Sequence, residues 1–233
     1  DTDAYQLKDI DLHIKSGEVI GILGPTGSSK STLVQLIPRL YDITEGSLKV
    51  GGHDIRDYDL QTLRDDVSIV LQKNTLFSGS ILENLKWGDP DASFKEVVAM
   101  AKLAQADEFV KERNDEYESE LGQGGTGVSG GQKQRLTIAR SLLKKPKILI
   151  LDNSTSAVDT KTESKLLEGF SKLDKDMTQI IISQRLSSFD QADRIVVMDN
   201  GSIADLGTSE ELYQRNEIYR LTYDIQNKGG EYE

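Results

Sequence analysis

The fold of this chain is decided by one stretch, Gly24-Pro25-Thr26-Gly27-Ser28-Ser29-Lys30-Ser31-Thr32. It follows the apolar run 19–23, which is typical of a buried parallel strand, and it precedes leucines at helical spacing, so a helix is predicted to begin near Lys30 and to kink or end at Pro38. A glycine-rich turn from strand to helix points backbone N–H groups at one place, where the helix dipole adds about half a positive charge. The stretch therefore predicts a loop that binds phosphate groups, with Lys30 on the outer phosphates and the Ser31 hydroxyl on Mg²⁺.

One residue of this loop departs from the strict pattern, which has glycine immediately before the lysine. This chain has Ser29 there, whose side chain either crowds the phosphates or adds a hydrogen-bond donor. The alternative interpretation is a glycine-rich loop that arises by chance. The strand before the loop and the helix after it disfavour that alternative.

A second motif that suits phosphate lies far downstream, after the glycine-rich segment 122–127. It reads Ser129-Gly130-Gly131-Gln132 and opens a predicted helix, of which Ser129 is a suitable N-cap. The two glycines allow a phosphate to approach the backbone. An ordinary capped helix is the alternative, and the presence of the first loop favours the phosphate contact.

A third motif is the apolar run 148–151, which ends in Asp152. It predicts a central strand with a carboxylate at its carboxyl end, the edge at which open α/β sheets bind ligands. Asp152 is therefore a candidate Mg²⁺ ligand, directly or through water. The alternative is a turn aspartate of the kind that any sheet contains.

Taken in this order, the motifs resemble the nucleotide-binding domain of an ABC transporter over nearly the whole chain. Gln72 matches the glutamine of the family's Q-loop, which is a Mg²⁺ ligand and a link to the membrane domain, and Asp159 matches the family's D-loop. Residues 129–132 match its signature motif. Segments 77–84, 119–123 and 207–212 are similar to exporters rather than importers.

The resemblance implies an α/β fold of the P-loop NTPase class. It implies a RecA-like core with a mostly parallel sheet over residues 1–75 and 146–233, with an antiparallel β portion near the N-terminus. A helical subdomain that carries the signature motif is inserted over residues 76–145. The implied cofactors are ATP and Mg²⁺, with Gln72 among the ATP-binding residues and Ser31, Gln72 and Asp152 as metal ligands.

Two catalytic positions differ from the family. Asn153 stands where the family has a glutamate, and Gln184 stands where it has a switch histidine. An amide cannot take a proton from water, and the loss of a general base typically lowers a rate by ~10²–10⁴-fold. With Asp159, these residues make up the candidate catalytic set, and we expect this site to bind ATP but to hydrolyse it slowly.

The intact signature motif predicts a partner. Family members pack two such domains head to tail, with each ATP between one phosphate loop and the other signature. The resemblance therefore implies the degenerate half of a heterodimeric, multidrug-type exporter, joined to a transmembrane domain at the cytoplasmic face of the membrane. Alternatively, Asn153 is an engineered substitution. The second departure, at Gln184, favours natural divergence instead.

The length of 233 residues agrees with a single α/β domain that carries a lobe. A net charge of −11 argues against wide contact with nucleic acid. The sequence has no apolar run of membrane-spanning length, so we expect the membrane domain elsewhere, in a longer protein from which this chain is cut or in another polypeptide. Tyr5 is the nearest candidate for stacking on adenine, but the expected ring lies before Asp1.

The remaining sequence predicts strands over 46–50, 177–183 and 194–198, a turn at Asn200-Gly201, and a helical tail over 209–226. Two alternative functions stay open. A non-transport ABC ATPase of DNA repair or translation is disfavoured by segment 77–84 and by the acidic charge. A purely regulatory nucleotide sensor is disfavoured by the intact signature.

Overall fold

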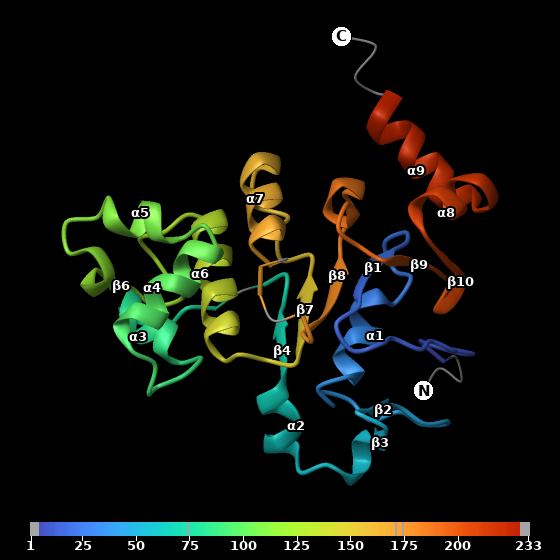
Figure 1. Ribbon diagram of the computed structural model, residues 1–233, viewed down its shortest axis with the longest axis horizontal. Helices are drawn as coiled ribbons and strands as arrows, with labels where there is room; N and C mark the ends of the chain where they lie inside the picture. Colours follow the sequence, from blue (N-terminus) through green and yellow to red (C-terminus); the bar gives the residue numbers. More distant parts are fainter. Residues whose placement is uncertain (1–4, 74, 171, 174, 229–233) are drawn as a thin grey trace. The chain divides into compact units, whose positions relative to one another are not determined.

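The computed structural model describes residues 5–73, 75–170, 172–173 and 175–228, and it divides into two compact units (Figure 1). Unit 1 comprises residues up to Arg64 and from Asp176 onward, and unit 2 comprises Asp65–Lys175. Within the described ranges, no helix has both the length and the apolar character needed to cross a bilayer.

Unit 1 is built on four sheet strands in the order β10-β9-β1-β8, in which β1 runs parallel to both of its neighbours. Buried isoleucines and valines of β1, β8 and β9 form much of the core. Strand β10 is antiparallel to β9 after the predicted turn at Asn200-Gly201. The sheet strands are β1 (Val19–Leu23), β8 (Thr178–Ile182), β9 (Arg194–Asp199) and β10 (Ser202–Gly207).

The other elements of unit 1 include a short antiparallel hairpin, β2 with β3, which confirms the predicted antiparallel portion near the N-terminus. The predicted helical tail is two helices, because Asn216 leaves the helical conformation between them. These elements are α1 (Lys30–Leu36), β2 (Lys49–Val50), β3 (His53–Asp54), the 3-10 helices Ile55–Asp57 and Leu186–Phe189, α8 (Ser209–Arg215) and α9 (Glu217–Lys228), with α2 (Leu60–Asp66) at the end of the first segment.

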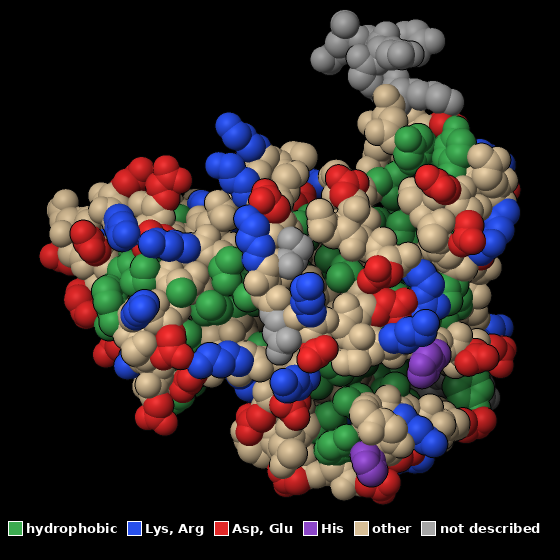
Figure 2. Space-filling view, in the orientation of Figure 1, with side chains coloured by type: hydrophobic (Ala, Val, Ile, Leu, Met, Phe, Trp, Pro, Cys, Tyr) green, Lys and Arg blue, Asp and Glu red, His purple; other side chains and the backbone are tan. Residues whose placement is uncertain are grey.

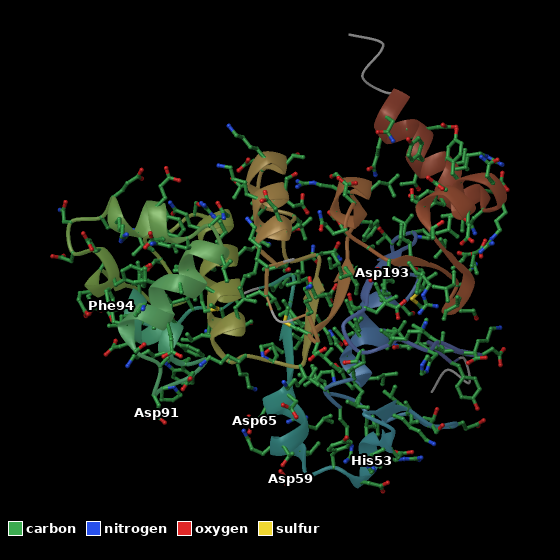
Figure 3. The ribbon with its side chains drawn as sticks, in the orientation of Figure 1. His53, Asp59, Asp65, Asp91, Phe94 and Asp193 are labelled. Atoms are coloured by element: carbon green, nitrogen blue, oxygen red, sulfur yellow. The ribbon has the colours of Figure 1, made fainter. Side chains whose placement is uncertain are left out.

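The amino ends of β1 and β9 are tied together by polar side chains. Asp193, labelled in Figure 3, accepts a hydrogen bond from Val19 N at 2.8 Å. The Arg194 guanidinium lies 2.6 Å from the Glu18 carboxylate and lowers the pKa of that carboxyl group. These contacts fix the strand register at one edge, so the carboxyl ends of β1, β8 and β9 share the opposite edge.

Unit 2 has two parallel strands, β4 and β7, and a group of packed helices in which α6 contacts both α3 and α4 (Figure 1). Capping boxes start three of these helices, where a serine is followed three residues later by Glu or Gln. The elements are β4 (Val67–Val70), β5 (Gly79–Ser80), α3 (Ile81–Lys86), α4 (Phe94–Leu103), α5 (Asp107–Lys111), the 3-10 helix Glu116–Glu118, β6 (Glu120–Leu121), α6 (Gly130–Leu143), β7 (Ile148–Asp152) and α7 (Thr160–Phe170).

The predicted fold class, an α/β protein with a mostly parallel sheet and a helical part, is confirmed. The strand predicted over 46–50 is shorter than expected, since β2 covers only Lys49–Val50. Helix α1 ends at Leu36, as Pro38 predicts.

Candidate nucleotide-binding site

The predicted phosphate loop connects β1 to α1 in unit 1, and its lysine is folded back over it. Lys30 is only 7% exposed, and its ammonium donates hydrogen bonds to the Gly24 and Pro25 carbonyls, each at 2.8 Å. A third bond, 3.2 Å long, joins the ammonium to the Ser28 hydroxyl. A buried positive charge is therefore held by the loop that the sequence assigns to phosphate.

The other residues of the loop form the turn between β1 and α1. Pro25, Thr26 and Gly27 are exposed, and Ser31 and Thr32 lie half-buried in the first turn of α1. Gly24 is needed for close approach, because a Cβ there would lie 2.2 Å from the Met198 carbonyl oxygen. Any side chain at this position would push the loop away from β9.

Ser29 has a left-handed backbone, with φ 66° and ψ 23°. This conformation costs an L-residue roughly 1–2 kcal/mol and costs glycine nothing. The glycine of the strict pattern is therefore explained here by backbone geometry.

We expect Ser29→Gly to raise the free energy of unfolding by about 0.5–1 kcal/mol, since relief of the left-handed strain exceeds the extra freedom that glycine gains in the unfolded chain. Urea denaturation of this domain measures the change. Ser29→Ala is the matched control, because it removes the hydroxyl but keeps the Cβ, and it should bring no gain. A glycine variant no more stable than the alanine variant would contradict the strain.

Gln184 lies at the same edge of unit 1 as the loop. Strands β1 and β8 are parallel, with Ile22 opposite Ile182, so two further residues bring Gln184 to the level of Gly24. The side chain of Gln184 is exposed. The position predicted for the switch residue is thus next to the phosphate loop in the sheet.

In unit 2, Gln72 and Asn153 also follow neighbouring strand ends. Val70 of β4 is opposite Leu151 of β7, and each of the two residues comes two positions later. Asp152 is the last residue of β7 and is 3% exposed. The carboxyl edge of this strand pair therefore carries two amides and a buried carboxylate, whose oxygen atoms are ligands of the kind that Mg²⁺ prefers.

Asn153 has the same unusual backbone as Ser29, with φ 46°. Its side-chain nitrogen donates a hydrogen bond to Asp152 Oδ1 at 3.3 Å. Asparagine tolerates the left-handed region better than most residues do. The position therefore holds an amide that donates toward the carboxylate and has no group able to accept a proton from water.

The signature residues form the first turn of α6. The Ser129 hydroxyl accepts from Gln132 N at 3.2 Å, and Gln132 Oε1 accepts from Ser129 N at 2.9 Å. The ordinary capped helix considered above is therefore present. Binding of phosphate by these residues stays a prediction. The capping box also gives the Gln132 side chain a structural role in starting α6.

The D-loop residues pack against this first turn within unit 2. A Cβ on Gly131 would lie 2.6 Å from the Ala157 carbonyl oxygen, and Gln134 Oε1 accepts from Ala157 N at 3.1 Å. Asp159 is exposed and accepts from Thr162 N at 3.0 Å, which lowers the pKa of its carboxyl group. Asp159 thus caps α7, and its predicted catalytic role is not tested by this contact.

Two residues of this region were missed by the sequence analysis. Gln134 is 5% exposed and connects α6 to the D-loop, and Arg135 donates to the Gln105 carbonyl at 2.6 Å while its guanidinium lies 4.7 Å from the centre of the Phe109 ring. For Gln134, the signal available in the sequence was a polar residue at a helix position that is expected to be buried.

Tyr5 is the candidate that the sequence offers for the adenine contact. That ring is 59% exposed, and its hydroxyl donates to Glu45 Oε1 at 2.6 Å. Tyr5 is therefore a surface residue held by a polar contact. The described residues also contain no group of three or more acidic, histidine or cysteine side chains that could hold a metal ion.

Comparison with known proteins finds a matching family model, similar proteins and a similar solved structure. A family model described as "ABC transporter" matches residues 7–156. The putative multidrug export ATP-binding/permease protein YgaD of Bacillus subtilis (strain 168) is 46% identical over 221 residues, which are 95% of this chain and 38% of YgaD. The protein SAB1799c of Staphylococcus aureus (strain bovine RF122 / ET3-1), described in the same words, is 45% identical over 227 residues, which are 97% of this chain and 39% of that protein.

A solved structure described as a bacterial Atm1-family ABC exporter with ATP bound is similar to this chain with a TM-score of 0.94 and 36% sequence identity. The likeness covers 97% of this chain and 40% of the exporter. The chain thus spans about two fifths of each of these relatives.

Proposed function

The chain belongs to the ABC transporter family, and from this premise we propose that it is the ATP-binding domain of an exporter, with a site of its own that binds ATP and hydrolyses it slowly. The observation that carries the proposal is the amide of Asn153, which donates to Asp152 at the carboxyl end of β7. The relatives' names, which describe export proteins with ATP-binding and permease parts, support the exporter.

ATP binding is assigned to the loop of residues 24–32. The Lys30 ammonium is buried against the loop carbonyls, and a triphosphate would offer it stronger, charged acceptors. The helix N-terminus at Lys30 adds backbone donors. Mg²⁺ would neutralise phosphate charge, with Ser31, Gln72 and Asp152 as its proposed protein ligands.

Slow hydrolysis follows from the chemistry of two side chains. Asn153 cannot act as a general base, and Gln184 can donate a hydrogen bond to an outer phosphate but carries no positive charge. Asp159 is bonded to the first turn of α7, and we keep it as a candidate for contact across the dimer. ATP at this site would therefore serve mainly to hold two domains together.

The partners in this proposal are a second ABC nucleotide-binding domain and the transmembrane domain of the exporter. The signature residues 129–132, at the positive end of α6, would complete the active site of the second domain. A partner that retains its glutamate and histidine makes the pair a heterodimer. The complex would lie at the cytoplasmic face of the membrane, and the division into a core (1–75 and 146–233) and a helical subdomain (76–145) is part of the same proposal.

The test restores a base to this site in the assembled exporter, with the partner's phosphate loop inactivated so that only this site can turn over. We expect Asn153→Glu to raise ATP hydrolysis at least tenfold, which is below the ~10²–10⁴-fold of a well-placed base because glutamate must adopt a left-handed backbone there. Phosphate release measures the rate.

Asn153→Gln is the matched control, since it has the length of glutamate without the base, and it should leave the rate unchanged. A wild-type site that already hydrolyses ATP as fast as the glutamate variant would overturn the proposed impairment. An exporter that turns over at neither site would instead support a regulatory nucleotide sensor.

A further inference from the structure

One side chain of the C-terminal helix holds the backbone on both sides of Arg185. Gln226, on α9, accepts a hydrogen bond from Leu186 N at 2.9 Å and donates one to the Gln184 carbonyl at 2.6 Å. A single primary amide thus pairs with a C=O and an N–H two residues apart, as a neighbouring strand would. The two partners are 40 and 42 positions away in the sequence.

The same segment is also held by two serines. The Ser183 and Ser188 hydroxyls, 6% and 1% exposed, lie 2.8 Å apart, and Arg185 N donates to Ser183 Oγ at 3.0 Å. The buried Ser183 hydroxyl holds Arg185 N, and Gln226 holds the Gln184 carbonyl and Leu186 N. Gln184 lies in between, with its exposed side chain not used in either set of contacts.

We propose that Gln226 is a positioning residue for Gln184. Its two hydrogen bonds fix the peptide from which the Gln184 side chain extends, at the level of Gly24 in the sheet, so that the amide meets the outermost phosphate of ATP. This inference rests on the proposed role of Gln184. The inference adds a role for α9, which contains none of the motifs described above: it controls how well this site distinguishes ATP from ADP.

The contacts of α9 with the rest of unit 1 are compatible with this role. Its first half is anchored in unit 1, where Tyr219 is 2% exposed and its hydroxyl lies 2.6 Å from Ser209 Oγ. Beyond that anchor, Leu221 and Ile225 are 54% and 73% exposed, and Figure 2 shows hydrophobic side chains on the surface in this region. Gln226 follows directly, so its bonds depend on where the second half of α9 lies.

The test compares Gln226→Met with Asn227→Met in the assembled exporter, with the partner's phosphate loop inactivated. Methionine has about the length of glutamine but neither hydrogen-bonding group. Asn227 is the matched control, because its amide donates to the Tyr223 carbonyl within α9, at 3.1 Å, and the described contacts do not join it to residues 184–186. Affinities for a non-hydrolysable ATP analogue and for ADP are measured by fluorescent-nucleotide displacement.

We expect Gln226→Met to weaken the ATP analogue about fivefold, the effect of losing a modest pair of partly exposed hydrogen bonds, and to leave ADP within twofold. Amide hydrogen exchange at Leu186 should become faster in this variant and stay unchanged in Asn227→Met. Gln226→Glu keeps the acceptor for Leu186 N but turns a carboxylate oxygen toward the Gln184 carbonyl, which repels it, so its loss of ATP-analogue affinity should be at least as large as that of Gln226→Met. It also serves as the second variant if Gln226→Met does not fold.

Gln184→Ala separates the two levels of the argument. If it weakens the ATP analogue selectively and Gln226→Met does not, the positioning role is overturned while the proposed role of Gln184 stands. If Gln184→Ala is not selective, the proposed role itself fails and the inference fails with it. The double variant should match Gln184→Ala alone, and additive losses, or equal losses for ATP and ADP, would show a purely structural Gln226.

Discussion

Replacing Gly131 with alanine is expected to reduce ATP turnover at the partner's site about 100-fold, the scale of loss that a displacement of ~1 Å causes in an aligned site. The reason is steric, because the new Cβ would lie 2.6 Å from the Ala157 carbonyl oxygen. Either the D-loop or the first turn of α6 must move. The measurement is steady-state ATP hydrolysis by the assembled exporter, together with ATP binding to this chain's own loop, which should stay within twofold.

Gly130→Ala is the comparison. Its Cβ would lie 3.8 Å from the Ala157 side chain, an ordinary contact, so the same substitution one position earlier should cost less. Alanine is also the better helix former by about 1 kcal/mol, so a loss at Gly131 cannot come from helix propensity. Full activity of the Gly131 variant would argue against any role of this turn at the partner's nucleotide.

Replacing Lys30 with methionine is expected to weaken ATP binding about 100-fold. Charge-assisted hydrogen bonds contribute about 1.5–3 kcal/mol each, and the ammonium that would make them toward phosphate is lost. Methionine retains most of the volume of the buried side chain. Calorimetric titration with ATP measures the change, and titration with adenosine should show none, since adenosine has no phosphate.

Lys49→Met is the matched control, because it removes the same charge from an exposed position on β2 in the same unit. It should leave the ATP affinity within twofold. Equal losses in the two variants would mean that net charge, rather than the loop, governs binding.

The parts of the fold that the sequence predicts well are those determined by neighbours along the chain. The apolar runs before Gly24 and before Asp152 form β1 and β7, and Pro38 ends α1 where a proline must. Asn200-Gly201 forms the turn between β9 and β10, since both residues accept positive φ, here 44° and 79°. Local spacing contains this information because each element depends on residues only a few positions apart.

The parts that the sequence does not predict depend on contacts between distant residues or on the backbone itself. Gln226 is one of many glutamines on polar helix surfaces, and only the folded chain brings its amide to Gln184 and Leu186. The approach of Gly131 to Ala157 is equally invisible in the motif that contains it. At Ser29 the sequence suggests that the side chain affects the space for phosphate, whereas the structure shows that the left-handed backbone is what favours glycine there.

The left-handed backbone of Asn153 also bears on how this chain can evolve. A mutation that gives back the glutamate places a residue in a conformation that disfavours it by roughly 1–2 kcal/mol, and it removes the bond to Asp152. An isolated reversion would then gain hydrolysis only at a cost in stability. If the site is impaired as proposed, this stability cost would oppose the return of a glutamate at position 153.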